Sequence, residues 1–429
     1  MSAPTLDEIR FHRLPKAFNP SGPVTEYDMF KGRRKQIESV LGGVFDQGRS
    51  VIIFGERGVG KTSLAKIIHD IIKSMGEKAS TQVVYSLVTC NRKASFSKLW
   101  HEIYKKVMIT LPAKQVIGFN TDDSAQKPEP QRIALGDATS PDSIDQDHIL
   151  NTISEVQSVW IFDEFNLVPE SEREAFADLI KALSDRNSRA TVILVCVAED
   201  VSEIIASHNS IERCTTQVLM PRMEASELGE ILERAETITE MSFSPDSKQL
   251  ILSLSQGFPY ITHFLGRDAA QAALSRNSLA INQADIDAAA RQFVDNAQES
   301  LKEAYRGATH SKAPNAIYEE VLLACALAKK DQYGNFTITS VANAISTLRQ
   351  RDVSAGVFAE HMAKFCEDAE RGQPLARKGA KGSWVYKFAN PLLQPYVLLK
   401  GKTSSRYSAA QLGLGNQNQE SAQMPEVHG

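Results

Sequence analysis

The sequence predicts an α/β fold in which a parallel sheet with helices on both faces is followed by a helical lid and a second, mainly helical domain. Three observations support this prediction. An apolar strand runs into a glycine-rich loop and a helix at residues 51–68. Five apolar strands alternate with helical segments up to Met220, and this order produces a parallel sheet. Beyond Met220, apolar residues recur with the helical period to about residue 307.

The glycine-rich loop Gly55–Thr62 matches the pattern G-x-x-x-x-G-K-[ST] without a mismatch. Its glycines let backbone N–H groups face phosphates at the start of a helix, and Lys61 adds a positive charge. The Thr62 hydroxyl is placed to bind Mg²⁺. The loop therefore predicts binding of ATP and Mg²⁺. The residues expected to contact the nucleotide are Gly55, Glu56, Arg57, Gly58, Val59, Gly60, Lys61, Thr62 and Ser63.

The composition is that of a soluble globular protein with two or three domains, because 429 residues exceed one ordinary core. Hydrophobic residues make up 42%, charged residues make up 23%, and the net charge is -4. These values exclude a wholly disordered or collagen-like chain. They also provide no overall attraction to nucleic acid, so any such affinity requires a local basic face.

The five cysteines are far apart and form no C-x-x-C pair, which argues against a zinc site and a disulfide framework. The N-terminus lacks the pattern of a signal peptide. No apolar run approaches the ~18 residues needed to span a bilayer. These features predict a cytoplasmic protein without a membrane partner.

Residues 1–28 are expected to form an extended arm, because Pro15, Pro20 and Pro23 interrupt any apolar period. The nucleotide-binding core is expected at residues 29–222 and begins with an amphipathic helix. Within this core, residues 118–147 leave no apolar face to bury, so we expect a disordered insertion there.

The apolar strand Val159–Phe162 ends in two acids, Asp163 and Glu164. Acids at the end of a buried strand are costly unless they serve a cation or a reaction. In phosphoryl transfer the first acid holds Mg²⁺, and the second can accept a proton from the attacking water. We therefore predict that Asp163 is a metal ligand and that Glu164 is the general base. An apolar run followed by Asp-Glu also occurs by chance, but the phosphate loop upstream favours the catalytic interpretation.

A helical lid is predicted at 223–310, and its contacts would convert loss of the terminal phosphate into movement. Residues 311–401 are predicted to form three helices and then two strands that flank a Gly/Lys turn. The polar tail at 402–429 is expected to be disordered.

The order of these motifs resembles AAA+ ATPases over about residues 28–400, in particular the replication-initiator and clamp-loader branch. The segment Phe30–Arg33 resembles the one that packs around the adenine in that superfamily. The segment Ser210–Cys214 resembles a clamp-loader segment whose arginine reaches the nucleotide of a neighbouring subunit. The resemblance implies that Arg213 is an arginine finger, and hence a catalytic residue alongside Glu164 and Lys61. It also implies a homo-oligomer with nucleotide at the subunit interfaces. The alternative for Arg213 is a surface residue.

Two segments depart from this family. A polar residue usually senses the terminal phosphate after the fourth strand, where this chain has Ala198, Glu199 and Asp200. An acid there would repel phosphate, so turnover is expected to be slow or dependent on a partner. The segment Ser255–Tyr260 resembles the G-x-P motif of STAND signalling ATPases, which implies a nucleotide contact by Pro259. The same segment resembles the sensor-2 motif of initiators equally well, which would make Arg267 the sensor. The spacing does not decide between the STAND and initiator resemblances.

The three helices and the hairpin resemble the winged-helix domain that ends initiator-type AAA+ proteins. No acid occurs from Arg371 through Lys400. This local basic face suggests DNA phosphate contacts by Arg377, Lys378 and Lys381. The alternative is a protein-binding face, because winged-helix domains also dock proteins.

Two functional hypotheses follow. The first is an ATPase, converting ATP and water to ADP and phosphate, that oligomerises, engages DNA and loads, targets or regulates a partner. The second is a STAND-like signalling or defence switch that acts through proteins without DNA. Both require an effector protein that the sequence does not identify, because no effector domain is visible.

Overall fold

We describe the protein from a computed structural model. The structure describes residues 5–20, 22, 32–79, 83–111, 131–197, 211–313, 316–380 and 382–414.

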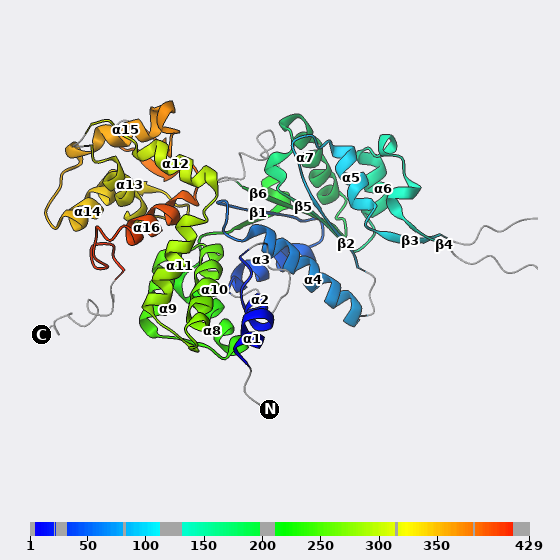
Figure 1. The fold of residues 1–429 in the computed structure, drawn as a ribbon. Helices are drawn as coiled ribbons and strands as arrows, with labels where there is room; N and C mark the ends of the chain where they lie inside the picture. Colours follow the sequence, from blue (N-terminus) through cyan, green and yellow to red (C-terminus); the bar gives the residue numbers. More distant parts are fainter. Residues whose placement is uncertain are drawn as a thin grey trace, which may run out of the picture.

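A five-stranded sheet forms the centre of the first domain, in the order β2-β5-β6-β1-β7 (Figure 1). Every pairing in it is parallel, so the carboxyl ends of the strands meet at one edge. β1 leads into the glycine-rich loop and lies between β6 and β7. The predicted α/β fold class is confirmed. The strands are β1 (Ser50–Gly55), β2 (Val84–Thr89), β5 (Ser158–Asp163), β6 (Ala190–Val197) and β7 (Thr215–Leu219).

Both faces of this sheet are buried, which explains why its strands are continuously apolar. Along β1, Val51 and Ile53 enter one core, whereas Ile52 and Phe54 enter the other. The first core contains residues of α3 and α4, and the second contains residues of α5, α6 and α7. These helices are α3 (Arg34–Phe45), α4 (Lys61–Ala79), α5 (Phe96–Tyr104), α6 (Gln146–Ile153) and α7 (Glu170–Asp185).

Four helices follow the sheet domain and pack together through α10 and α11 (Figure 1). A capping box of Asn282 and Asp285 fixes the start of α11. The elements are α8 (Ala225–Thr239), β8 (Ser242–Phe243), α9 (Pro245–Ser255), α10 (Pro259–Ser275), β9 (Ala280–Ile281) and α11 (Gln283–Asp295).

The N-terminal segment is helical, so the expectation of an extended arm was wrong for the described residues 5–20. It forms α1 (Leu6–Glu8), a π-helical turn (Ile9–Arg13) and α2 (Leu14–Ala17). Pro15 lies in the first turn of α2, where the missing N–H does no harm. Arg13 donates from Nη1 to Glu240 at 2.6 Å, and buried Phe18 packs against Gly266. Tertiary packing against the lid therefore imposes the helical form.

Two segments predicted to be disordered are partly ordered. Residues 131–147 of the expected insertion contribute β4 (Gln131–Ala134), which pairs antiparallel with β3 (Met108–Leu111), and the start of α6. The rest of that prediction, residues 118–130, lies outside the described residues. In the expected tail, Leu412 and Leu414 are buried, and Gln411 Nε2 donates to Leu348 O at 2.7 Å. Residues 415–429 lie outside the described part of the chain.

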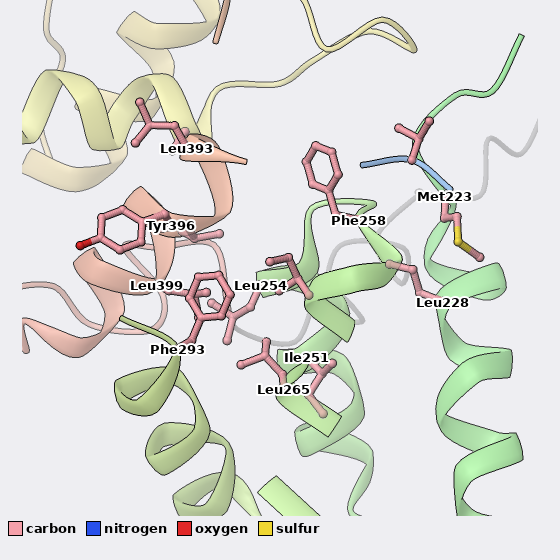
Figure 2. Close-up of a cluster of buried hydrophobic side chains, with 14 of the residues drawn as sticks. Met223, Leu228, Ile251, Leu254, Phe258, Leu265, Phe293, Leu393, Tyr396 and Leu399 are labelled. Carbon is pink, nitrogen blue, oxygen red and sulfur yellow. The ribbon is translucent and has the colours of Figure 1, made fainter. Parts of the chain in front are cut away.

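The C-terminal domain combines helices with the three-stranded antiparallel sheet β10-β12-β11. Figure 2 shows that α16 shares a core with the lid, because Tyr396 and Leu399 lie beside Phe293 and Leu254. No helix among the described residues is long and apolar enough to cross a membrane. The elements are α12 (Glu299–Thr309), α13 (Tyr318–Leu327), β10 (Phe336–Thr337), α14 (Ile338–Arg349), α15 (Ala359–Glu367), β11 (Leu375–Lys378), β12 (Val385–Phe388) and α16 (Leu393–Thr403).

Candidate nucleotide-binding site

The glycine-rich loop connects β1 to α4 through backbone conformations that favour glycine. Gly58 has φ 89° and Gly60 has φ 97°, both in the left-handed region. Helix α4 begins at Lys61, so the last residues of the loop lie at its N-terminus. This geometry presents backbone N–H groups and the positive end of the helix dipole to an anion.

Lys61 is buried under the loop and is held by its backbone. Nζ donates to Gly55 O at 2.9 Å and to Glu56 O at 2.6 Å. Burial lowers the pKa of Lys61 to about 8, although the nearby Asp163 carboxylate partly opposes this shift. The lysine therefore carries its charge at neutral pH, but it binds its proton less firmly than a solvent-exposed lysine does.

Asp163 and Glu164 lie at the carboxyl end of β5, beside the loop. Asp163 is buried, and its Oδ1 accepts a hydrogen bond from the Glu164 N–H at 2.9 Å. Glu164 is exposed and has φ 56°, a left-handed conformation that is uncommon for a residue with a side chain. The turn Phe165–Leu167 follows, and Leu167 N donates to Glu164 O at 2.9 Å. This sharp turn separates a buried acid from a solvent-accessible one.

A cavity of about 420 Å³ joins these elements. It is lined by the loop, by Asp163 and Glu164, and by residues of the N-terminal segment and the lid. The predicted site residues that line it are Arg57, Gly58, Val59, Gly60, Lys61, Thr62, Ser63, Asp163, Glu164 and Pro259. The cavity size lies within the range typical of small-molecule sites.

Thr62 and Asp163 fit the metal that the loop implies. Both line the cavity, and both carry the oxygen ligands that Mg²⁺ prefers. Asp163 uses Oδ1 to accept the Glu164 N–H, which leaves Oδ2 for a cation. Mg²⁺ typically takes one or two protein oxygens together with phosphate and water, so two ligands from the chain are sufficient.

Arg33 lines the cavity and belongs to the segment whose family resemblance implied packing around the adenine, whereas His263 was not predicted from the sequence. Arg33 is 2% exposed and donates to Val59 O and Pro221 O, which ties the loop to the beginning of the lid. Burial lowers its pKa to about 10. His263 of α10 is also buried, which lowers its pKa to about 4, and its Nδ1 faces the Asn19 N–H at 3.4 Å. The neutral imidazole ring, together with the apolar lining residues Met223 and Ile231, suits the uncharged base of a nucleotide better than its phosphates.

A polar junction outside the cavity was also missed. Glu56 of the loop pairs with Arg222 at 2.7 Å, and Arg222 Nη1 donates to Gln394 of α16 at 2.5 Å. Gln394 is fully buried and donates to Gln256 Oε1 at 2.7 Å. The lid and the C-terminal domain therefore meet the glycine-rich loop at one point. These residues are isolated in the sequence, so only the folded chain identifies the junction.

Other predicted residues lie away from the cavity. Arg213 is exposed at the start of β7, at the opposite end of the parallel sheet from the loop. Arg267 pairs with Asp268 at 2.7 Å and lines a neighbouring cavity of about 430 Å³. Glu199, together with Ala198 and Asp200, lies outside the described residues.

Two of the predicted basic residues in the C-terminal domain already have partners. Arg377 forms an ion pair with Glu367 and stacks over Trp384 at 4.4 Å, and Lys378 also has a partner. Lys381 lies outside the described residues.

Solved structures with a similar fold include the ORC2 protein of Aeropyrum pernix, with 14% identity and a TM-score of 0.47 over 91% of this chain and 98% of that one. A Walker-type ATPase of Pyrococcus abyssi has 14% identity and a TM-score of 0.49, covering 89% of this chain and 99% of the other. The Aeropyrum pernix ORC1 protein in complex with DNA has 14% identity and a TM-score of 0.42, covering 95% and 100%. These similarities are too distant to support an argument about function.

Sequence comparison gives a more specific result. No curated protein matches the chain. Residues 21–276, more than half of the chain, match the family described as nSTAND1, Novel STAND NTPase 1. This match includes the glycine-rich loop, the acid pair, Pro259 and the lid as far as α10. The predicted similarity to STAND ATPases is thereby confirmed, and the predicted similarity to initiator-type AAA+ proteins recurs among the solved structures. The chain belongs to the Novel STAND NTPase 1 family.

Proposed function

We propose that the protein binds ATP with Mg²⁺, hydrolyses it, and uses the nucleotide state to change the relation between its sheet domain and its lid. The observation that carries this proposal is the single cavity into which Lys61, Asp163 and Glu164 all converge. Its walls come from the sheet domain and from the lid, so a bound nucleotide contacts both. If ATP and ADP make different contacts with these two walls, each favours a different conformation of the protein.

In the proposed reaction, Lys61 exchanges the carbonyls of Gly55 and Glu56 for phosphate oxygens. Thr62 and Asp163 would hold Mg²⁺, which would supply positive charge beside the phosphates. Glu164 is exposed next to Asp163 and is in position to accept a proton from the attacking water.

Two substitutions test this proposal. Lys61→Ala should abolish stable nucleotide binding, because the phosphates lose the buried charge. Glu164→Gln should retain ATP but not hydrolyse it, since an amide keeps the shape and cannot accept the proton. Binding of labelled ATP and release of phosphate are the measurements. Undiminished binding by the first variant, or parental turnover by the second, would refute the assignment.

We also propose that Arg213 completes the site of a neighbouring subunit. Its position at the far end of β7 prevents it from reaching the nucleotide of its own chain. An arginine finger in trans contributes on the order of 10³ or more in rate. Mixing Arg213→Ala with Glu164→Gln should restore activity at interfaces that pair an intact Arg213 with an intact Glu164. If mixed oligomers form but ATPase activity does not rise above the sum of the two variants, Arg213 is a surface residue.

A second candidate function is DNA engagement through the C-terminal domain, which we interpret as a winged helix. Basic residues Arg377, Lys378 and Lys387 on β11 and β12 favour it, although Glu367 neutralises part of that charge. Reversing the charge of Arg377 and Lys378, and of Lys381 between them and β12, should weaken DNA binding uniformly and flatten its salt dependence. Equal affinity and salt slope in the parent and the variant would exclude this surface, leaving a switch that acts through an effector protein.

A further inference from the structure

Asn166 lines the candidate site, although no sequence pattern predicted a role for it. It lies in the turn that follows Glu164 and lines the nucleotide cavity together with Asp163 and Glu164. Its Oδ1 accepts a hydrogen bond from the Val197 N–H at 2.9 Å, at the end of the neighbouring strand β6. A side chain from the β5 turn therefore reaches the carboxyl end of β6, at the edge of the sheet that borders the cavity.

Hydrogen bonds hold this side chain in one orientation. Arg173 of α7 donates from Nη2 to Asn166 O at 2.9 Å and from Nε to Val168 O at 2.8 Å, which fixes the backbone of the turn. The amide oxygen Oδ1 accepts the hydrogen bond from the Val197 N–H, so the Nδ2 group remains to donate to a ligand. Within the part of the chain that the structure describes, Nδ2 has no hydrogen-bond partner.

We propose that Asn166 is the residue that senses the terminal phosphate, and that its Nδ2 group donates a hydrogen bond to an oxygen of that phosphate. The inference rests on the proposed binding of ATP in this cavity. A neutral amide can donate to phosphate without adding charge, and a fixed donor stabilises the additional negative charge of the transition state. The alternative that the sequence offers for this role is Glu199, an acidic residue, and a negative charge there would repel the phosphate.

The competing explanation is that Asn166 only joins two strands. The substitution Asn166→Asp separates these roles, because aspartate retains an oxygen to accept the Val197 N–H while turning a donor into a negative charge. Asn166→Ala removes both bonds. Asn187→Asp provides a matched control, since Asn187 is an exposed residue in the connection between α7 and β6, outside the cavity.

The experiment measures the affinities of ADP and of a slowly hydrolysed ATP analogue, each with Mg²⁺, together with steady-state ATPase activity. For Asn166→Asp we expect analogue affinity to fall about tenfold or more, with ADP affinity within about threefold of the parent. For Asn166→Ala we expect a loss of about 10²-fold in kcat, as for removal of one preorganised donor. Asn187→Asp should match the parent in all three measurements.

The outcomes distinguish this inference from the proposed function. If the parent does not hydrolyse ATP but Asn166→Asp still weakens only the analogue, hydrolysis is refuted and the sensing role stands. If the parent hydrolyses ATP and both Asn166 variants retain parental affinity ratios and kcat, the sensing role is refuted and hydrolysis stands. Loss of ADP and analogue binding together would also overturn the inference, because a contact made only to the terminal phosphate leaves ADP binding intact.

Discussion

At the scale of single residues, the most informative side chain is Lys61. Its ammonium group donates to two carbonyls of its own loop, and burial lowers its pKa to about 8. A phosphate beside it would raise that pKa again, because an opposite charge favours the protonated amine. The complex therefore binds the proton more firmly than the free protein does.

This difference predicts that nucleotide affinity falls as the pH rises above about 8, by at most about tenfold per pH unit. The phosphates do not contribute to this change, since groups with a pKa near 6 are already fully ionised. Titrations with labelled ADP from neutral pH upward measure the effect. Lys61→Arg should bind more weakly but show no such slope, because arginine keeps its charge in this range. A flat profile in the parent would show that Lys61 is not the titrating group.

The sequence identified the residues whose role depends on a local pattern. Lys61, Thr62, Asp163 and Glu164 were found because their spacing from a strand and a helix defines their position. Asn166 and His263 could not be found in this way. Each reaches the cavity only because a turn or a helix from another part of the chain is folded against it.

At the scale of elements, the N-terminal helices show how tertiary contacts override a local signal. The prolines at 15 and 20 suggested an extended arm, yet α2 begins at Leu14 with Pro15 in its first turn. Phe18 is 2% exposed, and a Cβ at Gly266 would lie 2.5 Å from its ring. The same segment places Asn19 in the wall of the cavity. By contrast, all five core strands were predicted, because their runs of apolar residues reflect burial on both faces.

Truncating Phe18 tests whether this segment shapes the site. Phe18→Ala removes a buried aromatic ring and should lower the free energy of unfolding by about 3–5 kcal/mol. It should also weaken ADP binding, because Asn19 and His263 lose the ring that packs beside them. The matched control is Phe11→Ala, in the same segment but 64% exposed, which should change stability by at most about 0.5 kcal/mol. Equal effects of the two substitutions in thermal unfolding and ADP titration would contradict this account.

At the scale of the whole molecule, the junction of Glu56, Arg222 and Gln394 joins the glycine-rich loop to the C-terminal domain. Glu56 and Arg222 are only 11% and 12% exposed, and Gln394 also donates to Ala326 O at 3.0 Å. Gly334 lies so close that a Cβ there would be 2.3 Å from Glu56 Oε1. The glycine-rich loop is therefore packed directly against the C-terminal domain.

Removing Gln394 should loosen this contact without disturbing the far side of the sheet. Gln394→Ala leaves buried donors and acceptors unsatisfied, a loss of about 1–3 kcal/mol for each group. Amide hydrogen exchange should therefore become faster in α16 and around Arg222, and stay unchanged in α5 and α7. Gln283→Ala, at an exposed position on α11, serves as the control. If α16 exchanges at the same rate in both variants, the junction does not hold the C-terminal domain in place.

The same junction constrains the order in which the protein can be completed during synthesis. Arg222 bonds to Glu56, which is 166 positions earlier in the chain, and to Gln394, which is 172 positions later. Domains of a growing chain generally fold from the N-terminus as they emerge. The sheet and most of the lid can therefore form while one side of Arg222 still faces solvent. Only when α16 emerges from the ribosome does the guanidinium obtain its last acceptor, so the nascent core must stay folded without the contact between Arg222 and Gln394.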